Sequence, residues 1–86
     1  MKLIFCRECE DVVRLIRWKR RCRCKASGGQ YLDDGVNAEF WGPATPLGFD
    51  NPSLVYAIQR QCNHTSRVFE AFVIERHCKT FKKVEA

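Results

Sequence analysis

The sequence lacks several features that would place it in a common class of protein. Among its 86 residues there is no apolar run long enough to span a membrane, so we expect no membrane contact. The apolar run Leu3–Phe5 is too short for the hydrophobic region of a secretory signal, so we predict a cytoplasmic protein. No internal repeat or low-complexity stretch occurs, and the length suits one modest core. We therefore predict a single domain over residues 1–86.

Histidine is also scarce, which bears on catalysis. The two histidines lie in no nucleophile or metalloprotease motif. Glu8, Glu10 and Asp11 do cluster, and we expect them to cap backbone donors or to pair with nearby arginines. We predict that the protein is not an enzyme.

Cysteine is plentiful, and four of the six cysteines form two close pairs. Cys6 and Cys9 form a Cys-x-x-Cys pair, and after twelve residues Cys22 and Cys24 form a Cys-x-Cys pair. Structural zinc takes four ligands in a tetrahedron, and thiolates suit it. The spacing therefore predicts one metal ion held by all four cysteines, with zinc expected and iron as the alternative.

The second cysteine pair is one residue shorter than the first, so its turn must close differently. We expect residues 25–29 to curl back toward the metal, because Ser27, Gly28 and Gly29 allow a tight path. A disulfide framework is less consistent with the expected reducing compartment. A redox Cys-x-x-Cys normally opens a helix, whereas residues 12–16 are β-branched and strand-like.

Positive charge is concentrated around the cysteine pairs. Residues 12–32 contain seven cations and no acid, while the segments on either side each sum to −1 and the whole chain to +5. Arginine suits phosphate recognition, so we predict nucleic-acid contacts at six positions. These are Arg14, Arg17, Lys19, Arg20, Arg21 and Arg23. The alternative is that these cations neutralise the net −2 of four thiolates with one divalent ion, or form a solvated face.

Three aromatic residues accompany the cations. Trp18, Tyr31 and Trp41 could stack on unpaired bases. The alternative is ordinary packing within the sheet or core.

The pattern of residues predicts an α+β fold, in which a zinc-ribbon-like hairpin (residues 1–29) continues into an antiparallel sheet with one packed helix (residues 30–86). Asp33-Asp34-Gly35 predicts a hairpin turn, and Asp50 or Asn51 as N-cap, followed by Pro52, predicts the start of the helix. Strands are expected at 2–5, 12–16, 20–22, 30–32, 36–41 and 68–74, a loop at 42–49, and the helix at 52–61. Residues 68–74 are apolar on both faces except Glu70, which predicts a central strand.

A second metal site is a further hypothesis. Cys62, His64, His77 and Cys78 offer four ligands with twelve residues between the inner pair. Alternatively, Cys62 is a small side chain on the apolar face of the helix, together with Leu54, Val55 and Ile58.

Several segments together resemble a family of small uncharacterised bacterial zinc-ribbon-type proteins. They are Met1–Cys6 with Cys9, Cys22-x-Cys24, Tyr31–Asp33, Ala38-Glu39, Pro46–Phe49 and Phe69–Ile74. The resemblance spans most of the chain and implies a bacterial or phage-borne cytoplasmic protein with four cysteine ligands, but no activity. In such knuckles a proline and a glycine often flank the second cysteine, and here Arg7 and Glu10 stand in those places.

The sequence thus predicts a small non-enzymatic zinc-binding module that binds nucleic acid through a basic hairpin. Two other functions stay open. One is a protein–protein adaptor or regulator that uses an apolar loop at Pro46–Phe49. The other is a thiol-based redox or metal sensor, suggested by the six cysteines.

Overall fold

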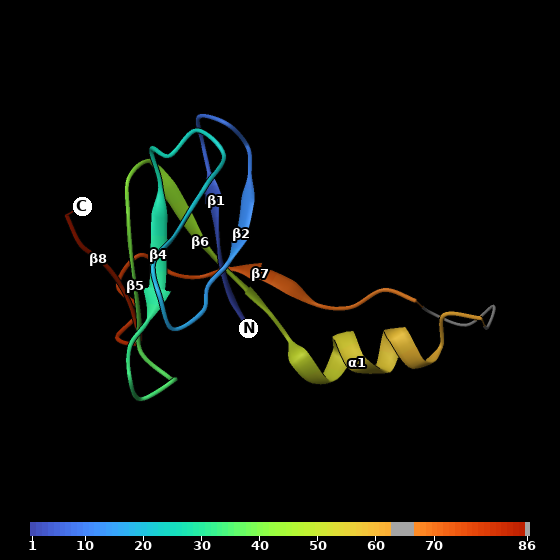
Figure 1. Cartoon of the computed structure of the whole chain (residues 1–86). Helices are drawn as coiled ribbons and strands as arrows, with labels where there is room; N and C mark the ends of the chain where they lie inside the picture. The colour runs from blue at the N-terminus through green and yellow to red at the C-terminus, as the bar shows by residue number, and fades with distance from the viewer. Residues whose placement is uncertain (63–66, 86) are drawn as a thin grey trace.

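The computed structural model describes residues 1–62 and 67–85, which contain two four-stranded sheets and one helix (Figure 1). The first sheet, in the order β2-β1-β6-β7, consists of β1 (Lys2–Cys6), β2 (Val12–Arg14), β6 (Ala44–Phe49) and β7 (Ala71–Val73). The second, in the order β3-β4-β5-β8, consists of β3 (Arg20–Arg21), β4 (Gly28–Tyr31), β5 (Ala38–Trp41) and β8 (Phe81–Lys83). The helix α1 (Asn51–Gln59) follows β6. These elements confirm the predicted α+β class.

The two short strands between the cysteine pairs belong to different sheets. Val13 of β2 pairs antiparallel with Ile4 of β1, whereas Arg20 of β3 pairs antiparallel with Gly29 of β4. Ile16 marks the crossing, because its carbonyl accepts a hydrogen bond from Tyr31 at 2.6 Å in the second sheet. The strands expected at 12–16 and 20–22 therefore do not pair with each other in one hairpin, and each cysteine pair has a hairpin of its own.

The β4–β5 hairpin confirms the predicted Asp-Gly turn. Gly35 has φ +70°, a value that glycine adopts without steric cost. The Asp34 carboxylate accepts hydrogen bonds from the backbone N–H groups of Val36 at 3.0 Å and Asn37 at 2.9 Å. These two donors, the Val36 group first, hold the pKa of Asp34 below its usual value.

The segment predicted as a loop at 42–49 is largely a strand, so that prediction is wrong. β6 lies between β1 and β7, and Pro46 stands opposite Ile4. The Pro46 carbonyl accepts a hydrogen bond from Ile74 at 3.0 Å, so its nitrogen faces the same side, where β7 ends and no donor is needed. Gly48 lies under the Phe72 side chain, so a Cβ there would lie 2.6 Å from the Phe72 ring.

The predicted central strand at 68–74 is also wrong in its placement. Only Ala71–Val73 is a strand, and β7 lies at the edge of the first sheet with all three residues exposed. Val73 is 67% exposed and Phe72 54%. An apolar strand predicts two covered faces, but within residues 1–62 and 67–85 no further strand pairs with the outer edge of β7.

The helix begins as predicted, but it lies in a different place. The Asp50 side chain caps it by accepting a hydrogen bond from the Ser53 backbone at 3.1 Å. Figure 1 shows α1 extending away from both sheets instead of covering a sheet face. Its single buried residue is Ala57, and Ile58 is 59% exposed. Across residues 1–62 and 67–85, no helix has the length and apolar character needed to cross a membrane.

The core lies between the two sheets. It combines side chains from β1, β2 and β6 of the first sheet with side chains from β5 and β8 of the second. Ile4 is fully buried and Leu15 is 1% exposed, and the Phe40 and Phe81 rings meet edge to face with centroids 5.2 Å apart. Cys6 and Cys22 belong to this cluster, so the cysteine site forms one end of the core.

Candidate metal centre

The first knuckle, the turn that carries Cys6 and Cys9, closes the β1–β2 hairpin. The Cys6 amide donates to the Asp11 carbonyl at 2.9 Å, and the Glu10 amide donates to the Cys6 carbonyl at 2.8 Å. Glu10, directly after Cys9, has φ +59°, a left-handed conformation that favours glycine. Glu10 therefore occupies a position for which glycine is better suited.

The second knuckle, with Cys22 and Cys24, closes the β3–β4 hairpin in a similar way. The Cys22 amide donates to the Ser27 carbonyl and the Lys25 amide to the Cys22 carbonyl, both at 3.0 Å. Lys25, directly after Cys24, has φ +67°. The shorter pair thus keeps a left-handed residue immediately after its second cysteine. The turn closes at Ser27, one residue before the predicted glycines.

Gly28 and Gly29 serve packing in β4 and do not form the curl predicted for them. A Cβ on Gly28 would lie 2.4 Å from the Trp41 ring, and one on Gly29 would lie 2.7 Å from the Glu39 carbonyl. These glycines therefore allow β4 to approach β5 and its buried tryptophan closely.

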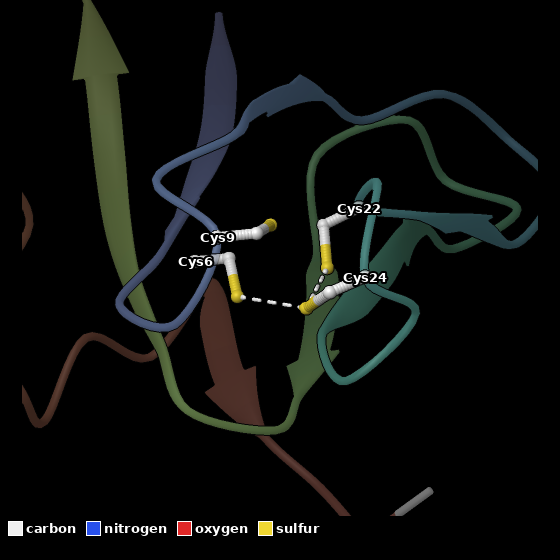
Figure 2. A group of neighbouring side chains, drawn as sticks. All are labelled: Cys6, Cys9, Cys22 and Cys24. Carbon is white, nitrogen blue, oxygen red and sulfur yellow. Dashed lines mark hydrogen bonds between the residues drawn. The ribbon is translucent and has the colours of Figure 1, made fainter.

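The four sulfurs converge on a common centre (Figure 2). All four Sγ atoms lie within 4.8 Å of one another, with Cys24 at 3.7 Å from Cys6 and 3.5 Å from Cys22. A tetrahedron with metal–sulfur bonds of about 2.3 Å has edges of about 3.8 Å. Within residues 1–62 and 67–85, these four residues form a cluster that could hold a metal ion, and the two pairs face each other as predicted.

The surroundings of Cys6 favour its thiolate form. The Ser27 hydroxyl and then the Cys9 backbone N–H lower the pKa of Cys6 to about 6. The Ser27 hydroxyl is fully buried and makes no hydrogen bond of ordinary geometry, so the nearby Cys6 sulfur is the acceptor that suits it best. Sequence reasoning did not identify this role for Ser27, because a serine near a cysteine pair carries no specific signal.

The pKa values of Cys22 and Cys24 shift in opposite directions. Burial opposes ionisation of Cys22, but the backbone N–H of Ser27, 3.4 Å from its sulfur, contributes to a net lowering of the pKa. The Ala26 backbone N–H lowers the pKa of Cys24, yet the competing Cys22 sulfur and burial raise it to about 12. Four neighbouring sulfurs cannot all ionise by themselves, and a bound cation would remove this conflict.

Two further contacts join the knuckles directly. The Arg23 backbone N–H donates to Asp11 Oδ2 at 2.9 Å, and its guanidinium donates to the Cys9 carbonyl at 3.0 Å. Asp11 is thus a cap for a backbone donor, as expected, and Arg23 braces one knuckle against the other.

The connection between β5 and β6 also passes between the knuckles. The Arg7 amide donates to the Pro43 carbonyl at 2.8 Å, and Ala44 pairs with Cys6. Gly42 has φ +86°, and a Cβ there would lie 2.1 Å from the Ala26 carbonyl oxygen. This connection therefore touches the loops of both cysteine pairs, and only glycine fits at its closest point.

The structure places all six predicted nucleic-acid-binding cations at the surface. They are Arg14, Arg17, Lys19, Arg20, Arg21 and Arg23. Their surroundings differ, because Arg20 donates to the Arg14 carbonyl at 3.1 Å and the Lys19 ammonium lies 5.8 Å from the Trp41 ring centre. Lys19 and Arg21 also share a small hollow with Glu39 and Glu85.

The three predicted aromatic residues separate into two groups. Trp18 is 69% exposed, whereas Trp41 is 6% exposed and packs over Gly28. Tyr31 is half-buried, and its hydroxyl accepts a hydrogen bond from the Lys2 amide at 3.0 Å. Only Trp18 has a ring open enough for stacking on a base.

The hypothetical second metal site gains no support within residues 1–62 and 67–85. Cys62 is exposed beyond the end of α1, whereas Cys78 packs against the core. His77 is exposed, and His64 lies outside the described residues. Among the described residues, the one group that could hold a metal ion is the tetrad of Cys6, Cys9, Cys22 and Cys24.

Comparison of the chain with known protein families, with curated proteins and with solved structures found no match. The resemblance to zinc-ribbon-type proteins therefore depends on the residues quoted above, and the four-cysteine cluster is compatible with it.

Proposed function

We propose that this chain is a non-enzymatic zinc-binding module whose metal-braced surface binds nucleic acid. The proposal depends on Trp18 and the residues on either side of it. This ring is 69% exposed and lies between the exposed cations Arg17 and Lys19, on the crossing that links the two sheets. Base stacking on an aromatic ring flanked by phosphate-binding cations is typical of single-strand recognition.

Zinc is proposed over iron because four thiolates near tetrahedral spacing suit a structural zinc site. The ion would be held by Cys6, Cys9, Cys22 and Cys24, which close two hairpins from different sheets. Its role here is to fix the crossing between those hairpins. Native mass spectrometry of the purified protein would identify the metal and its stoichiometry, and a metal other than zinc would contradict this part.

The nucleic-acid proposal is tested by removing two exposed cations that do not brace a knuckle. The double variant Arg14→Ala, Arg17→Ala should weaken binding to a single-stranded oligonucleotide at low salt. The slope of log affinity against log salt concentration should become shallower by the amount expected for about two phosphate contacts. Trp18→Ala should weaken binding further while leaving the salt dependence nearly unchanged. Fluorescence anisotropy at several salt concentrations would measure both.

The matched control is Lys79→Ala with Lys82→Ala, which removes the same charge from exposed positions outside residues 12–25. Equal losses in both double variants would indicate general attraction to a cationic protein and contradict a specific surface. Absence of binding to DNA and RNA at low salt would contradict the proposal entirely.

A protein adaptor is the second candidate, and it is favoured by a different surface from the one predicted. The Pro46–Phe49 segment is paired within β6 and is not available as an apolar loop. Exposed apolar side chains lie instead on α1 and β7, where Val55 is 52% exposed and Phe72 54%. Ile58→Glu should abolish capture of a protein partner and leave oligonucleotide binding unchanged.

A further inference from the structure

A groove of about 620 Å³ opens where β6 and β7 of the first sheet approach β5 and β8 of the second. Its apolar lining includes Phe40, Pro46 and Ile74, and its charged lining includes Arg7, Arg76 and Lys83. The volume falls in the range of small-molecule sites, about 300–1,000 Å³, which also combine apolar walls with a few polar groups.

The apolar wall of the groove is held in place by the fold. Phe40 is 6% exposed and packs edge to face on Phe81, and its carbonyl accepts a hydrogen bond from Val84 at 2.7 Å. On the other side, the Pro46 carbonyl accepts the Ile74 amide at 3.0 Å. Both walls are therefore strands fixed by backbone hydrogen bonds and do not need to form around a ligand.

The cations reach the groove from three separate segments. The Arg7 guanidinium donates to the Ala44 carbonyl at 3.1 Å and to Thr45 Oγ1 at 3.3 Å, and both of these residues also line the groove. Lys83 is set by its pairing with Phe40 across the parallel β5–β8 ladder. Arg76 is exposed just beyond β7. Convergence from distant positions in the chain is not explained by a general excess of charge along one stretch.

The charge of the groove matches a particular class of ligand. Three cations and one carboxylate, that of Glu75, line it, which leaves a formal excess of two positive charges. A phosphate monoester carries about −1.5 to −2 at neutral pH and offers three acceptor oxygens. Arginine forks and a lysine ammonium suit such a dianion better than a single carboxylate.

We propose that this groove binds a small phosphate monoester, with the phosphate held by Arg7, Arg76 and Lys83 and the organic body resting on Pro46, Ile74 and Phe40. The site goes beyond the proposed nucleic-acid surface, because none of the six cations of that surface lines it. The expected ligand is a free small molecule of nucleotide size, since the groove is closed on two sides by the sheets.

Isothermal titration calorimetry of the metal-loaded protein with adenosine monophosphate tests the proposal. Adenosine and inorganic phosphate are probes that each lack one half of the ligand. We expect the nucleotide to bind more tightly than either half. Equal affinity for adenosine would remove the role of the cations, and equal affinity for inorganic phosphate would remove the role of the apolar wall. Either result, or no binding of the nucleotide, overturns the proposal.

Variants at exposed positions locate the binding without threatening the fold. Lys83→Ala and Arg76→Ala should each reduce affinity roughly tenfold, the expected loss of one charge-assisted contact. Glu75→Gln should increase affinity. Lys82→Ala is the matched control, because Lys82 is the neighbour of Lys83 on β8 but does not line the groove. Equal losses in the Lys82 and Lys83 variants would overturn the assignment.

Competition separates this site from the nucleic-acid surface. An oligonucleotide without a terminal phosphate should leave nucleotide binding unchanged, even when it saturates the surface around Trp18. Displacement of the nucleotide by that oligonucleotide would assign the groove to the phosphodiester chain and overturn the proposal. The Arg14→Ala, Arg17→Ala double variant should bind the nucleotide normally whether or not the nucleic-acid proposal holds.

Discussion

Two regions of this molecule differ in how much of their apolar surface they bury. The clamped body, residues 1–49 and 71–85, has a core in which Ile4 and Phe81 are at most 1% exposed, although Trp18 and Phe72 at its surface are open. In the arm, residues 50–62 and 67–70, Ile58 is 59% exposed and Val68 81%. The body has two sheets that cover each other's inner faces and a cysteine cluster at one end. The arm has one short helix and a returning segment without regular secondary structure, which cover little apolar surface.

The arm is attached to the body through a small number of contacts at its base. The Asp50 amide donates to the Glu70 carbonyl and the Glu70 amide donates to Ser53 Oγ, both at 2.9 Å. The Phe49 and Phe69 rings meet with centroids 5.1 Å apart. A metal ion held by the four cysteines would stabilise the body, whereas the arm has only its cap and its base contacts. The following predictions test that division.

Loss of the metal should have the largest effect, and it should fall on the body. We expect Cys22→Ser, or removal of the ion by a chelator, to cost about 10 kcal/mol of apparent folding free energy. The two knuckles would then no longer hold hairpins from different sheets together. Thermal unfolding and amide hydrogen exchange in β1 and β5 would measure the loss.

The control for this prediction is Cys62→Ser, which changes an exposed cysteine beyond the end of α1. It should leave metal content and unfolding unchanged. A metal-free protein that unfolds at the same temperature as the loaded protein would contradict the proposed dependence of the body on the ion.

Acid should release the metal through the same cluster. The pKa of Cys6 is about 6 in the folded chain against an ordinary 9.0, first because of the Ser27 hydroxyl. Since the folded-state value is the lower one, this group stabilises the fold fully above pH 9.0, and its contribution disappears as the pH falls through about 6. Because a bound cation competes with the proton for this thiolate, metal retained after dialysis should decline only below about pH 6.

Ser27→Ala isolates the cause of that pH dependence. Without the hydroxyl, the pKa of Cys6 should rise, and the pH at which the metal is lost should rise with it. A midpoint identical to that of the unaltered protein would show that Ser27 does not support the thiolate.

Gly42 offers an intermediate perturbation of the body. Gly42→Ala should cost roughly 3 kcal/mol, because a side chain at φ +86° is strained and its Cβ would lie 2.1 Å from the Ala26 carbonyl oxygen. Gly35→Ala is matched in conformation at φ +70°, but its nearest neighbour is the Arg17 side chain at 4.0 Å. It should cost only about 1 kcal/mol. Equal losses in chemical denaturation would show that crowding at Gly42 is not important.

Local chemistry explains which parts of this fold were predictable. Short-range signals were reliable: the cysteine spacing, the Asp34-Gly35 turn and the Asp50 cap each predict their local structure correctly. In each case a few adjacent residues determine the backbone by sterics or by hydrogen bonds. The convergence of the four cysteines was predictable because a tetrahedral ion would restrict their spacing.

Predictions that depended on distant partners were less accurate. β6 contains Pro46, yet it is a strand because the missing N–H faces the place where β7 ends. β7 is apolar, yet it lies at an edge because no other described strand pairs with its outer side. The groove that contains Arg7, Arg76 and Lys83 has no signal in sequence, since it exists only where the two sheets meet.

A smaller change should affect the arm and leave the body intact. Asp50→Ala removes the acceptor of the Ser53 amide and should cost about 1 kcal/mol of local helix stability. Asn51→Ala, one position later and exposed, is the control and should have little effect. Hydrogen exchange should increase in α1 alone, with metal content and the unfolding temperature of the body unchanged. A change in metal content would show that the two regions are coupled.

The smallest effect should have the opposite sign and should appear in the body. Glu10 and Lys25 hold φ values of +59° and +67°, each directly after the second cysteine of its knuckle. This conformation costs a side-chain-bearing residue about 1–2 kcal/mol, whereas glycine adopts it freely but loses about 0.5–1 kcal/mol more backbone entropy on folding. Glu10→Gly and Lys25→Gly should therefore each raise the stability of the loaded body by a few tenths to about 1 kcal/mol. Glu8→Gly, whose φ is not positive, should lower it. If both glycine substitutions destabilised the protein in thermal unfolding, the left-handed conformation after each second cysteine would not be a source of strain. It would then not explain how the Cys-x-x-Cys and Cys-x-Cys pairs form similar turns around one site.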